Sequence, residues 1–289
     1  MRDSASDRWR AAVTAWHEVA DSVYHRRYDP LDVSVCVVRG ADGLLLVDTR
    51  SSHREADEVR GDLRVFGDVA VRWVVNTHAH YDHCFGNARF GRASDVGAPI
   101  YGHRRVPAHL DAFERPRLAD WIARGVEPVA DWREVVITPP DVLIDDRATL
   151  DLGDRGVELL HFGRGHTDND LVVHVPDADA WLVGDLVEQS GPPMYGSGSF
   201  PLEWPATVTA LAARLDPEAT VVPGHGAAVG RAFVVTQQAD LQRVAEVIID
   251  LHAAGVSAAE APAHGRSRWP FPEDGMARAV ADAYRQLDA

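Results

Sequence analysis

The sequence predicts a layered α/β domain with helices added at both ends of a central core. Apolar runs of strand length alternate with segments of helical periodicity, a pattern typical of this fold class. At 289 residues and 46% hydrophobic, the chain is large enough to bury a sizeable core. It has no internal repeat with a period of about 20 to 50 residues and no long low-complexity linker. We therefore expect one domain over residues 1–289, with its core at about 33–230.

The N-terminal part of the chain predicts a helix, a hairpin, a second helix and a strand. Residues 5–24 carry apolar side chains at three- and four-residue spacing, which indicates an amphipathic helix. We expect this helix to pack on the domain body, with a homodimer contact as the alternative role. Gly40-Ala41-Asp42-Gly43 joins two apolar runs and therefore favours a hairpin. The elements expected after the first helix are strands over residues 33–38 and 44–47, a helix over 53–66 and a strand over 71–75.

The rest of the chain predicts an insertion, a group of short strands and C-terminal helices. Residues 103–134 are polar and aromatic, with helical segments that prolines interrupt, so we expect a lid or an inserted subdomain beside the functional site. The loop over residues 190–201 is rich in Gly, Pro and Ser. The other expected elements are strands over 142–144, 148–152, 157–161, 171–175, 181–183 and 220–222, helices over 203–215 and 231–254, and a short last helix within the C-terminal addition, residues 231–289.

Composition excludes several classes of partner. A net charge of −15 disfavours nucleic acid, because phosphate binding depends on Lys and Arg. All 29 basic residues are Arg, so no lysine is present to form a Schiff base or to clamp a substrate carboxylate. The N-terminus is too charged for a signal peptide, and no apolar stretch approaches the roughly 18 residues that span a bilayer. Cys36 and Cys84 are expected to pack as small apolar residues without a disulfide. We therefore expect a cytoplasmic protein that acts on a small molecule and contacts neither membranes nor nucleic acid.

The most informative segment is the loop over residues 76–87, which follows an expected strand. It places His78, His80, Asp82 and His83 within six positions. Burying so many titratable groups without a shared cation is costly, so the loop predicts a metal centre. His78 and His80 point to the same side of an extended segment, whereas a turn into a helix swings Asp82 and His83 toward a second position. One loop can thus begin two adjacent metal sites.

Three later segments supply further ligand-type side chains. Each ends an expected strand with a small residue, followed by His166, Asp185 or His225. Strand ends on a rigid scaffold are where α/β proteins usually build their sites, so we expect all three at the same end of the sheets. Imidazole and carboxylate ligands without a thiolate suit Zn²⁺, with Fe or Mn as alternatives.

Together, these motifs resemble the metallo-β-lactamase fold superfamily over roughly residues 33–230. The resemblance implies an αββα sandwich with the site at an edge between the two sheets. Asp48, at the end of an early strand, matches the superfamily's aspartate that braces the metal loop. The loop over residues 76–87 is similar to that of bacterial metallo-hydrolases of the quinoprotein-relay kind and of unassigned members. The ligands that the resemblance implies are His78, His80 and His166 for the first metal, Asp82, His83 and His225 for the second, and Asp185 as the bridge.

The two-metal form implies a hydrolase with two Zn²⁺ ions per chain. A hydroxide shared by two metals is a strong nucleophile at neutral pH, because metal binding lowers the pKa of water to about 7. We expect it to attack the carbonyl carbon of an ester, lactone, thioester or amide, while Asp82 orients the hydroxide and passes a proton to the leaving group. Tyr195, in the loop after Asp185, is either a hydrogen-bond donor to the developing oxyanion or a packing residue.

Three other interpretations stay open. Some members of this superfamily bind one iron through two His and one Asp and oxidise persulfides with O₂, a role that His78, His166 and Asp185 would serve. β-Lactam hydrolysis is expected only as a weak side activity, because the chain has no lysine clamp. A non-enzymatic binding module is disfavoured, since a structural zinc needs only four ligands. The remaining histidines considered, which we expect to be structural or exposed, are His103, His109, His161 and His174.

Overall fold

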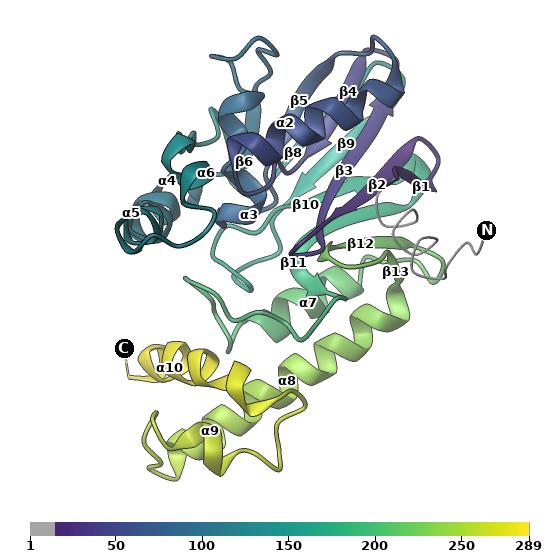
Figure 1. Ribbon diagram of the computed structural model, residues 1–289. Helices are drawn as coiled ribbons and strands as arrows, with labels where there is room; N and C mark the ends of the chain where they lie inside the picture. The colour runs from purple at the N-terminus through teal and green to yellow at the C-terminus, as the bar shows by residue number, and fades with distance from the viewer. Residues whose placement is uncertain (1–14, 289) are drawn as a thin grey trace, which may run out of the picture.

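The computed structural model describes residues 15–288, which form two β-sheets packed face to face between helices (Figure 1). The N-terminal sheet contains β1 (His17–Ala20), β2 (Val23–Tyr28), β3 (Val33–Gly40), β4 (Gly43–Val47), β5 (Val71–Val75), β6 (Ile100–His103) and β7 (Val142–Ile144). The C-terminal sheet contains β8 (Arg147–Asp151), β9 (Gly156–Leu160), β10 (Val172–Val175), β11 (Ala180–Glu188), β12 (Thr220–His225) and β13 (Val229–Gly230).

The two sheets meet along one seam. Hydrogen bonding between strands follows the order β7-β6-β5-β4-β3-β12-β11-β10-β9-β8, with β2 between β1 and β3 and with β13 beside β12. Strands β4 to β7 are parallel, as are β11 and β12, whereas β3 meets β12 in an antiparallel pairing of Val33 with His225. His225, which was predicted as a metal ligand, therefore lies at the joint between the two halves of the sandwich.

Helices cover both outer faces, which gives the predicted αββα layers (Figure 1). On one side α2 (His53–Asp62) covers the N-terminal sheet, and on the other α7 (Trp204–Ala212) and α8 (Arg231–Ala253) cover the C-terminal sheet. The remaining α-helices are α3 (Tyr81–Cys84), α4 (Val106–His109), α5 (Arg115–Arg124), α6 (Val129–Glu134), α9 (Ala261–His264) and α10 (Met276–Leu287). None of the helices within residues 15–288 has the length and apolar character needed to cross a bilayer.

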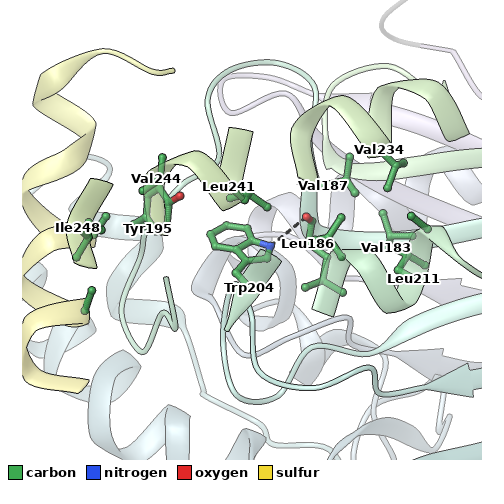
Figure 2. Close-up of a cluster of buried hydrophobic side chains, with 14 of the residues drawn as sticks. Val183, Leu186, Val187, Tyr195, Trp204, Leu211, Val234, Leu241, Val244 and Ile248 are labelled. Carbon is green, nitrogen blue, oxygen red and sulfur yellow. Dashed lines mark hydrogen bonds between the residues drawn. The ribbon is translucent and has the colours of Figure 1, made fainter. Parts of the chain in front are cut away.

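Alternation of side chains along the strands builds the layers. In β3, Val38 faces the interior between the sheets while Val37 packs toward α2. In β11, Leu182 faces the same interior while Val183 joins the cluster beneath α7 and α8. Figure 2 shows this outer cluster around Trp204, whose Nε1 donates a hydrogen bond of 3.2 Å to the carbonyl oxygen of Leu186.

Residues 103–134 form a helical insertion between β6 and β7, as the polar-aromatic sequence predicted. It consists of α4, a π-helical turn over Leu110–Glu114, α5 and α6. The insertion has its own apolar cluster, in which Leu118 and Trp132 pack with Phe85 from the loop after β5. The insertion is therefore anchored on the loop that carries the predicted ligands.

The prediction of a helix over residues 5–24 is wrong for residues 17–24, which form strands and the turn between them. Residues 17–20 and 23–28 form the antiparallel strands β1 and β2, and β2 pairs with β3 along its whole length. This pairing satisfies the backbone and buries Val23 and His25, which outweighs the helical spacing of the apolar residues. Residues 5–14 lie outside the described part of the chain, so the homodimer contact assigned to this helix stays a prediction.

Candidate metal centre

The loop after β5 places its ligand-type side chains in two directions. His80 has extended backbone angles and precedes α3, the short helix that contains Asp82 and His83. His78 and His80 therefore project from an extended segment, and Asp82 and His83 from the first turn of a helix. All four are at least nine-tenths buried.

The first group joins His78 and His80 to His166, from the loop between β9 and β10, and to Asp185 of β11. His80 Nδ1 lies 2.8 Å from His166 Nε2 and 3.1 Å from His78 Nε2. Asp185 Oδ2 lies 3.4 Å from His166 Nε2 and 3.7 Å from His78 Nε2. One ring nitrogen of each imidazole thus faces a common point.

The second group joins Asp82 and His83 to His225, the last residue of β12. His83 Nε2 lies 3.3 Å from His225 Nε2, which lies 3.4 Å from Asp82 Oδ2. Asp185 Oδ1 lies 3.2 Å from His83 Nε2, and its Oδ2 lies 3.5 Å from His225 Nε2. Asp185 therefore stands between the two groups, where the resemblance placed a bridging ligand.

Asp48 orients the imidazole of His83 directly and that of His78 through Thr77. Its Oδ2 accepts hydrogen bonds from His83 Nδ1 at 2.8 Å and from Thr77 Oγ1 at 2.7 Å, and its Oδ1 accepts one from the Thr77 amide. Because the Thr77 hydroxyl donates to Asp48, its oxygen accepts from His78 Nδ1 at 3.1 Å. These contacts turn the Nε2 atoms of His78 and His83 toward the centre.

Two more imidazoles are held by backbone carbonyl groups. His80 Nε2 donates to the carbonyl oxygen of Ser197 at 3.0 Å, and His225 Nδ1 donates to that of Leu31 at 2.8 Å. His166 Nδ1 is buried and has no hydrogen-bond partner among the described residues. Four of the five central imidazoles are thus oriented by a partner on the outer nitrogen.

The donor set fits metal ions. Buried ring nitrogens that face one another at 2.8 and 3.3 Å would repel if both presented bare lone pairs. Ligand atoms of a tetrahedral zinc lie about 3.3 Å apart, since each Zn–N bond is about 2.0–2.1 Å long. In addition, Asp185 Oδ1 is buried and makes no hydrogen bond among the described residues. A shared cation accounts for both observations.

Burial and charge divide the imidazoles into two kinds. Burial lowers the pKa of His78, His80 and His166, so these rings are neutral and have a free lone pair. Burial also acts to lower the pKa of His83 and His225, but nearby carboxylates, Asp185 foremost, raise it above its ordinary value. A metal at the second group must therefore displace protons.

Asp82 stays ionised within the second group. Burial alone would raise the pKa of its carboxyl, but the imidazoles of His83 and His225 outweigh burial and lower that pKa to about 2. Gly224 leaves the space that Asp185 occupies, because a Cβ there would lie 1.7 Å from Asp185 Oδ1. Close backbone approach thus allows the carboxylate to sit between the two groups.

A cavity of about 470 Å³ opens onto the two groups. Asp82, Asp185 and His225 are among the residues that line it. The helical insertion contributes Arg117 and Trp121 to its wall, in agreement with the expected position of residues 103–134 beside the site. Other residues that line it are Leu31, Tyr81, Glu188, Pro192 and Met194.

Tyr195 does not line this cavity, although Met194 and Gly196 do. Its ring is buried in the cluster beneath α7 and α8, 5.2 Å from the ring of Trp204 (Figure 2). The oxyanion-donor role predicted for Tyr195 is therefore corrected to the alternative, a packing residue. The loop turns at this point so that alternate residues face the core and the cavity.

The structure places Asp185 inside a strand, whereas the sequence predicted it just after one. Its strand was expected to end at Val183, but β11 continues to Glu188. The pairing of β11 with β12 is irregular on either side of Gly184, which has a positive φ of 53°. This irregularity directs Asp185 into the centre from within a strand.

Three buried polar residues near the centre had no sequence signal. Glu114 is fully buried, and burial raises the pKa of its carboxyl to about 7. Glu188 lies within 4.8 Å of Asp185 and His225. His109, expected to be structural or exposed, is buried with its ring 5.3 Å from that of His80. Each stands outside the ligand motifs, so only tertiary structure brings it to the site.

The other three histidines expected to be structural or exposed lie away from the two groups. The rings of His103 and His161 stack at 4.2 Å, and the ring of His174 stacks on Trp181 at 3.7 Å. His103 and His174 are buried, and His161 Nδ1 donates to the carbonyl oxygen of Asp170 at 2.8 Å.

Comparison with known proteins agrees with this architecture. Residues 28–225 match the family model described as the metallo-beta-lactamase superfamily. The chain is 31% identical over 228 residues to a hydroxyacylglutathione hydrolase of Anaeromyxobacter dehalogenans (strain 2CP-C), covering 74% of each protein. It is 26% identical over 194 residues to a metallo-beta-lactamase type 2 of Bacillus sp. (strain 170), covering 66% of this chain and 65% of that protein.

Solved structures share the fold at lower identity. The metallo-beta-lactamase from Pontibacter korlensis superposes with a TM-score of 0.63 at 20% identity, covering 78% of this chain and 98% of that one. The DIM-1 metallo-beta-lactamase gives a TM-score of 0.61 at 18% identity, covering 78% and 96% respectively. The fold, the site geometry and the family match lead to one conclusion: the chain belongs to the metallo-β-lactamase superfamily, whose members are mostly metal-dependent hydrolases.

Proposed function

We propose that this protein is a zinc-dependent hydrolase that cleaves an ester, lactone, thioester or amide bond of a small molecule. The observation that carries the proposal is the pair of buried ligand groups that share Asp185. When bound there, two zinc ions supply a nucleophilic hydroxide at neutral pH and polarise a carbonyl group. His78, His80 and His166 would hold one ion, Asp82, His83 and His225 the other, and Asp185 both.

The chain's own residues supply the remaining requirements. The Asp82 carboxylate is ionised and lines the cavity, so it can accept a proton and return it to a leaving group. A cavity of about 470 Å³ is of the size that holds a small-molecule ligand. Trp121, Leu31 and Met194 give the wall an apolar surface that displaces water from the substrate.

The names of two relatives suggest which classes of substrate to test first. A hydroxyacylglutathione hydrolase at 31% identity supports a thioester as the first class to test, and the metallo-beta-lactamase at 26% identity supports a β-lactam as another. Both cysteines are free and buried, which supports the reducing cytoplasm as the site of action.

The test begins with metal quantification on protein as purified, coupled to hydrolysis of a hydroxyacylglutathione, lactones, aryl esters and a chromogenic cephalosporin. We expect about two zinc ions per chain and turnover of at least one carbonyl substrate. In His80→Ala, both metal content and turnover should fall. About one iron per chain, no zinc and O₂ consumption with a persulfide would instead establish the iron oxidoreductase. Unchanged turnover in a variant that no longer binds metal would also overturn the proposal.

A further inference from the structure

The wall of the metal-centre cavity carries one permanent positive charge among the described residues that line it. That charge is the guanidinium of Arg117 on α5, in a chain of net charge −15. The Arg117 side chain is 26% exposed, so it is accessible from the cavity and only partly hydrated. An accessible arginine at the edge of a catalytic cavity is a candidate for substrate binding.

Arg117 is held in a defined orientation. Its Nη2 donates to Ser197 Oγ at 2.8 Å and lies 3.5 Å from Glu114 Oε1. Its guanidinium lies over the rings of Tyr81 and Trp121, at 5.4 and 5.7 Å from their centroids. Trp121 follows four residues later on α5, so both side chains project from one face of the helix. These contacts reduce the entropy lost when a ligand binds to Arg117.

The polar contacts that anchor Arg117 use only its Nη2 atom. Nε and Nη1 of Arg117 have no hydrogen-bond partner within residues 15–288. Arginine presents its donors in a planar fork that matches the two oxygens of a carboxylate. Nη2 carries two hydrogens, and only one of them is used by Ser197. The other can pair with Nε–H on one edge of the guanidinium or with Nη1–H on the other edge, so Arg117 can bind both oxygens of a carboxylate while it stays bonded to Ser197.

We propose that Arg117 binds the carboxylate of an anionic acyl substrate and so sets the specificity of the hydrolase. The proposal rests on the proposed function for the reaction and adds the class of substrate. The apolar part of such a substrate would contact Leu31, Trp121 and Met194, which line the same cavity. The competing explanation is that Arg117 only neutralises the buried Glu114, and the experiment is designed to separate the two.

The first measurement is binding of a matched pair of probes, 3-phenylpropanoate and its neutral amide, to the metal-loaded protein by calorimetry. We expect Arg117→Met to weaken binding of the carboxylate about tenfold or more and to change binding of the amide less than about twofold. Arg117→Lys should keep part of the preference, because it keeps the charge and loses the fork. The metals contribute equally to wild type and variant, so the difference reports Arg117 alone.

The matched control is Arg115→Met, on the same helix. Arg115 pairs with Asp111, is half exposed and does not line the cavity. Arg115→Met changes the net charge of the protein by the same amount as Arg117→Met. Its carboxylate binding should equal that of the wild type. Arg117→Gln is a second neutral variant to be used if Arg117→Met does not fold, as judged by thermal unfolding.

The second measurement compares hydrolysis of mono-4-nitrophenyl glutarate with that of 4-nitrophenyl butyrate. Arg117→Met should raise KM for the anionic ester about tenfold with little change in kcat, and leave both constants for the neutral ester nearly unchanged. Equal losses on both esters, or wild-type binding of the acid no tighter than of the amide, would overturn the proposal. Loss of carboxylate preference in a protein that hydrolyses neither ester would support the Arg117 site and count against the hydrolase.

Discussion

The metal centre and the wall of its cavity are built in different ways. The candidate ligands come from strands, from loops at strand ends and from the short helix α3, and four of the five imidazoles are fixed by hydrogen bonds on their outer nitrogens. The wall comes from the helical insertion between β6 and β7 and from the loop after β11. Its helices rest on a separate apolar cluster that contains Leu118 and Trp132.

This difference separates reaction chemistry from substrate choice. Ligand positions depend on strand register and buried carboxylates, so changes there should affect metal binding and turnover together. The wall depends on a helix face, so changes there should affect substrate affinity and leave the metals in place. The predictions below test that separation.

The largest effect is expected at the shared carboxylate. Asp185→Asn removes the charge that stands between both ligand groups, so kcat/KM on an active substrate should fall by about a thousandfold. Metal content should fall below two ions per chain, as measured by elemental analysis. A variant that keeps two metals and full turnover would show that the two groups do not depend on Asp185.

Metal affinity should rise with pH. The carboxylates around His83 and His225 raise the pKa of both imidazoles, so the metal-free centre binds protons at neutral pH. Release of at least one proton on zinc binding gives an affinity at pH 8 at least about 100-fold higher than at pH 6. Competition with a chelator at both values measures this difference, and an affinity independent of pH would contradict the assignment of these imidazoles as ligands.

Asp48 should matter for the metals without touching them. Asp48→Ala leaves His83 Nδ1 and Thr77 without their acceptor, so zinc affinity should fall about 10- to 100-fold. Asp68→Ala, on the exposed surface, is the control and should bind zinc like the wild type. If the two variants bind zinc equally well, Asp48 does not brace the loop.

The smallest effect is expected in the wall. Trp121→Ala removes an apolar surface of the cavity, so KM should rise by about tenfold while metal content and kcat stay close to those of the wild type. Trp121→Phe keeps much of that surface and should behave like the wild type. Loss of metal in Trp121→Ala would erase the distinction between the wall and the centre.

The same distinction explains what the sequence could predict. The αββα fold is confirmed, and most strands lie within a few residues of the predicted ones, because their runs are largely apolar and end at Gly, Pro, Asp or Asn. The structure brings all seven predicted ligands together, since six of them follow or end a strand and Asp185 lies at an irregularity within β11. Whether they hold metal stays a prediction until metal is measured.

Other features had no local signal. The sequence between residues 17 and 28 has spacing compatible with a helix, and only pairing with β3 makes it β1 and β2. Glu114 and Arg117 come from a polar segment in which any charged residue would be expected at the surface. Tyr195 lies in a loop that passes the cavity, and sequence gives no means of knowing which side its ring faces.

The pairing of Val33 with His225 places the metal centre across the joint between the two halves of the sandwich, so bound metals would also stabilise that joint. One half of the sandwich supplies His78, His80, Asp82 and His83, and the other supplies His166, Asp185 and His225. Metals bound by both sets would fasten the halves across their seam as a cross-link does, and they would stabilise the folded state by mass action. A chelator is therefore expected to loosen the joint between the halves as well as to stop turnover.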